Sequence, residues 1–72
     1  MSRRDGAFVK KMRLTEISRI IAKTFPAGCD FEKLVKQLEF QMGFREYTAR
    51  KYIDTVIQGQ GWILLDGMIK AE

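Results

Sequence analysis

A chain of 72 residues, 46% of them hydrophobic, has room for one small domain with a single core. Its longest apolar run, residues 62–65, is far shorter than a bilayer span or a signal sequence, so we expect no membrane contact and a location inside the cell, in the cytoplasm or on the nucleoid. The net charge of +4 favours a polyanionic partner.

The excess positive charge lies in residues 1–13. This segment carries five bases and one acid, Asp5, whereas residues 14–72 carry eight bases and eight acids. Because the segment has no clean period, we predict a flexible basic arm (residues 1–13) ahead of a folded domain (residues 14–72). The arm favours nucleic acid as the partner, and a solubilising tail is the alternative. The bases of the arm are Arg3, Arg4, Lys10, Lys11 and Arg13.

The first predicted helix spans residues 15–25. Thr15 suits the N-cap position, because its hydroxyl can accept a hydrogen bond from a free N–H group of the first turn. Pro26 ends the helix, since the residue before a proline avoids the helical conformation. The apolar residues that recur on one face of this helix are Ile17, Ile20, Ile21 and Phe25.

Two further amphipathic helices are predicted at residues 31–42 and 46–58. Asp30 can cap the first of them, and Gly43 directly after it is typical of a helix that closes in the left-handed conformation. Only residues 43–45 then separate the two helices. Their apolar stripes are Phe31, Leu34, Val35, Leu38 and Met42 in one, and Ala49, Tyr52, Ile53, Val56 and Ile57 in the other.

The last segment changes to the pattern of a β-hairpin. Residues 62–65 and 68–70 are joined by Asp66-Gly67, the dipeptide that a two-residue type I′ turn favours. The predicted cross-strand pairs are Leu65 with Met68, Leu64 with Ile69, and Ile63 with Lys70. One face of the hairpin then carries Trp62, Leu64 and Ile69, and the other carries Ile63, Leu65, Met68 and Lys70. We expect one face to pack on the helices and the other to stay exposed.

The sequence offers little for catalysis or metal binding. It contains no histidine, which excludes most zinc sites and every Ser-His or Cys-His nucleophile pair. Its single cysteine, Cys29, cannot form an internal disulfide and is expected to be a packed side chain in a connector. We therefore expect no enzymatic activity, no metal, no cofactor and no small-molecule ligand.

Two helices joined by a short glycine-containing link, followed by a hairpin, are typical of a helix-turn-helix with a wing. Residues 43–53, followed by Gly61-Trp62-Ile63 and the Asp66-Gly67 turn, resemble the winged helix-turn-helix superfamily of transcription regulators. The resemblance covers about residues 15–70. It implies a mainly helical α+β fold of three helices with a C-terminal two-stranded wing.

The resemblance also implies that the outward face of the helix at residues 46–58 reads double-stranded DNA in the major groove. Arginine suits guanine, and lysine suits phosphate or guanine. The arm and Lys70 would add phosphate contacts, and the arm could lie in a minor groove. A solvated helix face, with Arg50 paired to Glu46 or to Asp54, is the alternative. The predicted DNA-binding residues are Arg45, Tyr47, Thr48, Arg50, Lys51 and Thr55.

Two departures from the family pattern affect this prediction. Arg45 stands where a helix-capping side chain is usual, and arginine cannot accept from free backbone N–H groups. The wing is apolar rather than basic, so Ile63, Leu65 and Met68 could form a contact surface for protein. The alternative function is therefore a winged-helix adaptor that binds another protein. A homodimer through the wing or the arm is possible with either function.

Overall fold

The computed structural model describes residues 3–71, with side chains described from Val9 onward. It contains three helices and one three-stranded antiparallel sheet with the strand order β1-β3-β2. This confirms the predicted fold class, a mainly helical α+β fold of winged-helix type. The elements are α1 (Arg3–Ala22), β1 (Cys29–Asp30), α2 (Phe31–Met42), α3 (Glu46–Gln60), β2 (Ile63–Leu65) and β3 (Met68–Lys70).

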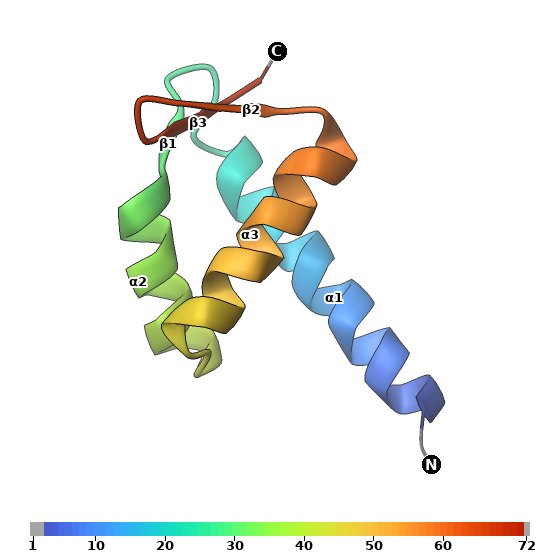
Figure 1. Cartoon of the computed structure of the whole chain (residues 1–72). Helices are drawn as coiled ribbons and strands as arrows, with labels where there is room; N and C mark the ends of the chain where they lie inside the picture. Colours follow the sequence, from blue (N-terminus) through green and yellow to red (C-terminus); the bar gives the residue numbers. More distant parts are fainter. Residues whose placement is uncertain (1–2, 72) are drawn as a thin grey trace.

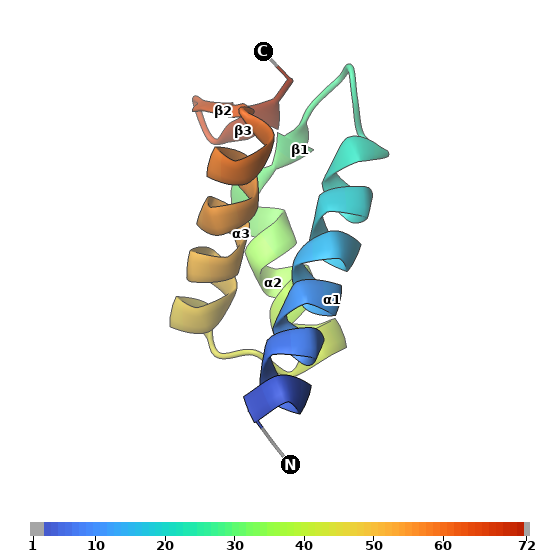
Figure 2. The ribbon, with the colours of Figure 1, turned by 90° about the vertical axis from the view of Figure 1, so that its right-hand side faces the viewer.

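The sheet lies at one end of the three helices, and the start of α1 projects beyond α2 and α3 at the opposite end (Figures 1 and 2). Helix α3 packs against both α1 and α2. Among residues 3–71, no helix is both long enough and apolar enough to span a bilayer.

Helix α1 begins much earlier than the sequence analysis predicts. The expected start was residue 15, but the helix runs from Arg3 to Ala22 and includes most of the segment predicted as a flexible arm. Thr15 therefore lies inside the helix, where its hydroxyl donates to the Lys11 carbonyl at 3.0 Å instead of capping. Lysine, arginine, methionine and alanine favour helix, which explains why the segment continues the helix without an apolar stripe of its own.

Helices α2 and α3 begin where the sequence predicts. The Asp30 carboxylate accepts from the Lys33 N–H at 3.0 Å, and Gly43 closes α2 with φ 69°. Arg45 precedes α3 without a side-chain cap, as its chemistry requires. Helix α3 ends at Gln60, two residues later than predicted, and Gly61 closes it with φ 73°.

The core is made by the predicted stripes of the three helices together with Cys29 of β1 and Ile69 of β3. Trp62 is half-buried rather than fully enclosed, and its ring meets Phe25 edge-on at a centroid distance of 5.0 Å. The fully or nearly fully buried residues are Ile17, Ile21, Cys29, Leu34, Val35, Leu38, Ala49, Ile53, Val56, Ile57 and Ile69.

The hairpin has the predicted register. Ile63 pairs with Lys70, Leu64 with Ile69, and Leu65 with Met68. Asp66 and Gly67 both have positive φ, at 53° and 77°, as a type I′ turn requires. Strand β1 was not predicted, because two residues are too short to show an alternating pattern. It pairs with β3 and thereby ties the start of α2 to the wing.

Gly28, in the connector before β1, is expected to resist substitution. Its φ is +112°, and an added Cβ would lie 3.3 Å from both the Ile69 carbonyl oxygen and the Lys70 Cγ. We expect Gly28→Ala to lower the free energy of unfolding by roughly 1–3 kcal/mol. Gly59 lies in α3 with open space around it, so Gly59→Ala should raise that free energy by roughly 0.5–1 kcal/mol. Urea denaturation measures the free energy of unfolding of both variants. Equal changes in that free energy would contradict the close packing at Gly28.

Candidate nucleic-acid interface

Helix α3 presents its predicted recognition face to solvent. Its buried stripe faces the other helices, so the residues on the opposite side are left exposed. Tyr47 keeps 70% of its surface exposed, and Thr48 is partly buried at the edge of the same face. The other predicted residues of this face that are exposed are Arg45, Lys51 and Thr55.

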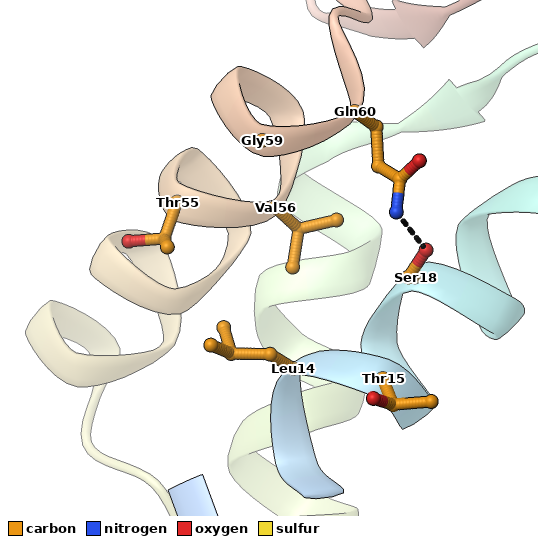
Figure 3. Close-up of a pocket in the computed structure, with 7 residues that line it drawn as sticks. All are labelled: Leu14, Thr15, Ser18, Thr55, Val56, Gly59 and Gln60. Atoms are coloured by element: carbon orange, nitrogen blue, oxygen red, sulfur yellow. Dashed lines mark hydrogen bonds between the residues drawn. The ribbon is translucent and has the colours of Figure 1, made fainter. Parts of the chain in front are cut away.

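A groove runs between α1 and α3, and we call it the α1–α3 groove. It consists of two hollows of about 310 and 280 Å³ that share Leu14 and Thr55 as lining residues. Figure 3 draws the hollow nearer the sheet, with α1 residues on one wall and α3 residues on the other. That hollow is also lined by Thr15, Ser18, Val56, Gly59 and Gln60. The second hollow is also lined by Lys10, Thr48, Lys51 and Tyr52.

The second hollow joins two features that the sequence analysis treated separately. Lys10 belongs to the segment predicted as the basic arm, and Lys51 belongs to the predicted recognition face. Because α1 is helical here, Lys10 is held beside α3 rather than on a mobile tail. Among the side chains described, from residue 9 to residue 71, neither lysine forms a salt bridge. Both ammonium groups can therefore bind an anion without first breaking an ion pair to any of these side chains.

Hydroxyl groups add polar character to the α1–α3 groove, but not all are equally available. The Thr55 hydroxyl donates to the Lys51 carbonyl at 2.9 Å within α3. Ser18 accepts a hydrogen bond from the Gln60 side-chain amide at 3.1 Å, which leaves its own hydroxyl proton able to donate (Figure 3). The Ser18–Gln60 contact also links α1 to the end of α3.

Aromatic rings contact two basic side chains close to the start of α3. The Lys51 ammonium lies 5.4 Å from the centre of the Tyr47 ring. The Arg13 guanidinium lies 5.2 Å from the centre of the Phe44 ring, and Phe44 in turn packs on Tyr52 at 4.7 Å. These contacts orient the cations without neutralising them.

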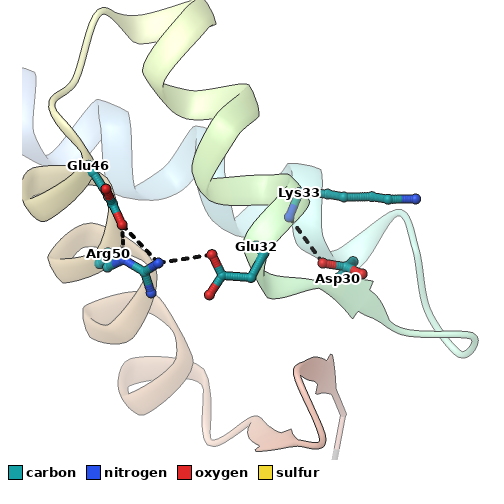
Figure 4. Close-up of polar contacts among 5 residues, drawn as sticks. All are labelled: Asp30, Glu32, Lys33, Glu46 and Arg50. Carbon is teal, nitrogen blue, oxygen red and sulfur yellow. Dashed lines mark hydrogen bonds and ion pairs between the residues drawn. The ribbon is translucent and has the colours of Figure 1, made fainter.

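Arg50, one of the predicted DNA-binding residues, is held by carboxylates of α2 and α3. Its guanidinium donates to the carboxylates of Glu32 and Glu46, each at 2.9 Å, and lies 5.6 Å from the Phe31 ring centre (Figure 4). Hydrogen bonds to Glu32, and then to Glu46, raise the pKa of Arg50 above its usual value. The pairing with Glu46 is the alternative that the sequence analysis left open. The pairing with Glu32 carries no sequence signal, because the partner lies 18 residues away on α2.

Removing Glu32 should leave Arg50 with Glu46 as its remaining carboxylate partner, so that its guanidinium is freer to contact the predicted DNA partner. We expect Glu32→Gln to strengthen DNA binding roughly threefold or more, because it removes a competing carboxylate and one negative charge. Fluorescence anisotropy with a labelled duplex measures the affinity. Glu39→Gln, also on α2, removes the same charge without touching the Arg50 pairs. Equal gains from both variants would mean that Arg50 makes no contact with DNA.

The remaining predicted phosphate-binding residues lie on α1 and β3. Lys10, Lys11 and Arg13 are exposed on α1, and Lys70 is exposed on β3. Arg3 and Arg4 lie in α1, but their side chains are outside the described part of the structure.

The wing presents its apolar residues differently from the prediction. Ile63 and Leu65 are exposed as expected, at 39% and 55%. Met68 is only partly exposed, because the connector at Gly28 lies against it. Leu64 shares a face with buried Ile69 and yet is 47% exposed, because β2 is the edge strand of the sheet. Both faces of β2 therefore carry exposed apolar side chains.

Cys29 is poorly placed for chemistry. Its side chain is 7% exposed, and burial, followed by the charge of Asp30, raises the pKa of the thiol. Among the described residues, no three histidine, cysteine, aspartate or glutamate side chains group in a way that could hold a metal ion.

Comparisons with protein-family models, with curated proteins and with solved structures each returned no match for this chain. The functional interpretation therefore depends on the geometry of the α1–α3 groove and of the exposed face of α3.

Proposed function

We propose that the protein is a small DNA-binding transcription regulator of the winged helix-turn-helix type. The exposed face of α3 would enter the major groove of the duplex, with Tyr47 toward the base edges and with Lys51 and Thr55 toward the phosphates on the α1 side. One phosphate strand would lie over the α1–α3 groove. The observation that carries this proposal is the meeting of Lys10 from α1 and Lys51 from α3 in one groove, with neither lysine in an ion pair among the side chains described.

The helical form of the N-terminal segment changes how it would contact DNA. An α-helix with its side chains is about 10–12 Å wide, whereas the minor groove of B-form DNA is only about 6 Å wide. Helix α1 therefore cannot enter the minor groove as an extended arm would. The basic side chains of α1 would instead lie along the phosphate backbone beside α3. Lys10, Lys11 and Arg13 are exposed there.

Phosphate contacts of this kind make binding strongly dependent on salt. We expect the affinity for a random-sequence duplex to fall as the salt concentration rises. The experiment is a titration of isotope-labelled protein with that duplex, followed by backbone amide shifts at low and at moderate salt. The proposal expects shifts at residues 45–55 and in the first half of α1 that weaken with salt. Shifts in residues 3–13 alone, or none at all, would contradict it.

A further inference from the structure

Strand β2 forms an open edge of the sheet. It is bonded to β3 on one side, and within residues 3–71 no strand lies on its other side. Its three residues are all apolar and are 39%, 47% and 55% exposed. Natural proteins usually blunt such an edge by keeping the strand very short or by adding a charge, a proline or a bulge, because its free backbone groups can pair with another chain. Strand β2 is short, but it contains no charge, proline or bulge.

The hydrogen-bonding pattern shows which backbone groups face the free edge. The Phe31 N–H donates to the Gly67 carbonyl at 2.9 Å, in register with the β1–β3 pairing. Because bonded and non-bonded pairs alternate in an antiparallel ladder, Ile69 directs its N–H and C=O toward β1. Leu64, which lies opposite Ile69 in β2, must then direct its own N–H and C=O away from β3. The free edge therefore presents one donor and one acceptor, both from the central residue of the strand.

We propose that two copies of this chain pair through β2, antiparallel, about a two-fold axis at Leu64. The two Leu64 residues would exchange two hydrogen bonds, and Ile63 would lie opposite Leu65 of the partner subunit. The two three-stranded sheets would then form one continuous six-stranded sheet. This inference goes beyond DNA binding and does not depend on it.

The edge fits a second copy because it is complementary to itself. A two-fold interface requires the same patch on both subunits, and a three-residue strand with its outward-facing groups on the middle residue meets that requirement. No charge lies on β2, so the pairing opposes no like charges. The basic side chains of the N-terminal segment that the structure describes, those of Lys10, Lys11 and Arg13, lie near the middle of α1 and not in the sheet. The net charge of +4 therefore opposes the contact only weakly.

The interface is short, so we expect a dimer that depends on concentration. The mass measured by sedimentation equilibrium should rise from 8.4 kDa toward twice that value between roughly 10 µM and 1 mM, the range of weak interfaces. Leu64→Pro removes the N–H that faces the free edge and leaves the bonds to β3 in place. We expect this variant to stay monomeric over the whole range. Phe40→Ala removes an apolar side chain that is 91% exposed on α2 and should dimerise as the unaltered protein does.

Disulfide trapping tests the position of the two-fold axis. Paired residues that exchange both hydrogen bonds have Cα atoms about 5.5 Å apart, within the range that a disulfide can bridge. Leu64→Cys should therefore give a covalent dimer under mild oxidation by oxidised glutathione. Phe40→Cys is the matched control, and it should cross-link at least tenfold more slowly. Cys29 is buried and should not contribute.

Circular dichroism must show that each variant retains its helices. A mass of 8.4 kDa for the unaltered protein at the highest concentration would overturn the proposal. Dimerisation of Leu64→Pro at the normal strength, or equal cross-linking at positions 64 and 40, would also overturn it, because either result would place the contact on another surface.

Discussion

We expect the Ile53→Ala variant to lose most of its free energy of unfolding and to be only marginally stable. Ile53 lies at the centre of α3, is 0% exposed, and belongs to the single core that all three helices share. Truncating a buried isoleucine to alanine costs about 3–4 kcal/mol, because it loses apolar burial and leaves a cavity. The total stability of a domain of this size is on the order of 5 kcal/mol. Urea denaturation followed by circular dichroism measures the loss.

The matched control for this prediction is Phe40→Ala. It removes a larger apolar side chain, but one that is 91% exposed on the outer face of α2. We expect the free energy of unfolding to change by less than about 0.5 kcal/mol. Similar losses from the two variants would mean that α3 does not form the centre of the core, and the packing described here would be wrong.

The sequence predicts best where a local pattern and the tertiary contacts agree. The α2 stripe, its Asp30 cap and its Gly43 closure all indicate the same helix, and the structure has the same bounds. The register of the hairpin follows from the Asp66-Gly67 turn alone, because a two-residue loop fixes every pair of the two strands. The apolar stripe of α3 likewise predicts which side of that helix is buried.

Prediction fails where local signals are weak or where the decisive contact is distant. Thr15 has the chemistry of a cap, yet the preceding residues continue the helix, so the start of α1 was placed twelve residues too late. Leu64 lies on the same hairpin face as Ile69, so the alternating pattern places it on the side that packs. Its exposure depends instead on which strand is at the edge of the sheet. The Glu32–Arg50 pair joins two helices, and only the fold brings it together.

The candidate site in the structure differs from the predicted one for the same reason. The sequence predicts Arg50 as one of six DNA-binding residues and predicts the basic arm as a separate, flexible element. The structure pairs Arg50 with two carboxylates beside α2 and continues α1 through the arm, so that Lys10 and Lys51 line one groove. A helix-spacing argument can place residues on a face of one helix, but it cannot show which face of another helix lies beside it.

If the protein binds DNA as proposed, replacing both Lys10 and Lys51 should weaken that binding more than replacing any other pair of lysines. If each ammonium group neutralises one phosphate, the Lys10→Ala/Lys51→Ala variant should reduce the slope of log affinity against log salt by about 2. The affinity at low salt should fall roughly tenfold to a hundredfold. Anisotropy titrations of a labelled duplex at several salt concentrations measure both quantities. The helices should be retained, because Lys51 is exposed on α3 and Lys10 is exposed on α1.

The control must remove the same charge from a different surface. Lys33 and Lys36 are exposed on α2, away from the α1–α3 groove, so Lys33→Ala/Lys36→Ala lowers the net charge equally. A binding site at the groove predicts a much smaller change in the salt slope for this pair, since long-range charge acts only through a screened field. Equal losses from the two double variants would indicate attraction to the whole positive protein, and α3 would then have no role as a DNA-reading helix. A loss confined to the Lys10 and Lys51 variant would tie the affinity to the groove where α1 and α3 meet.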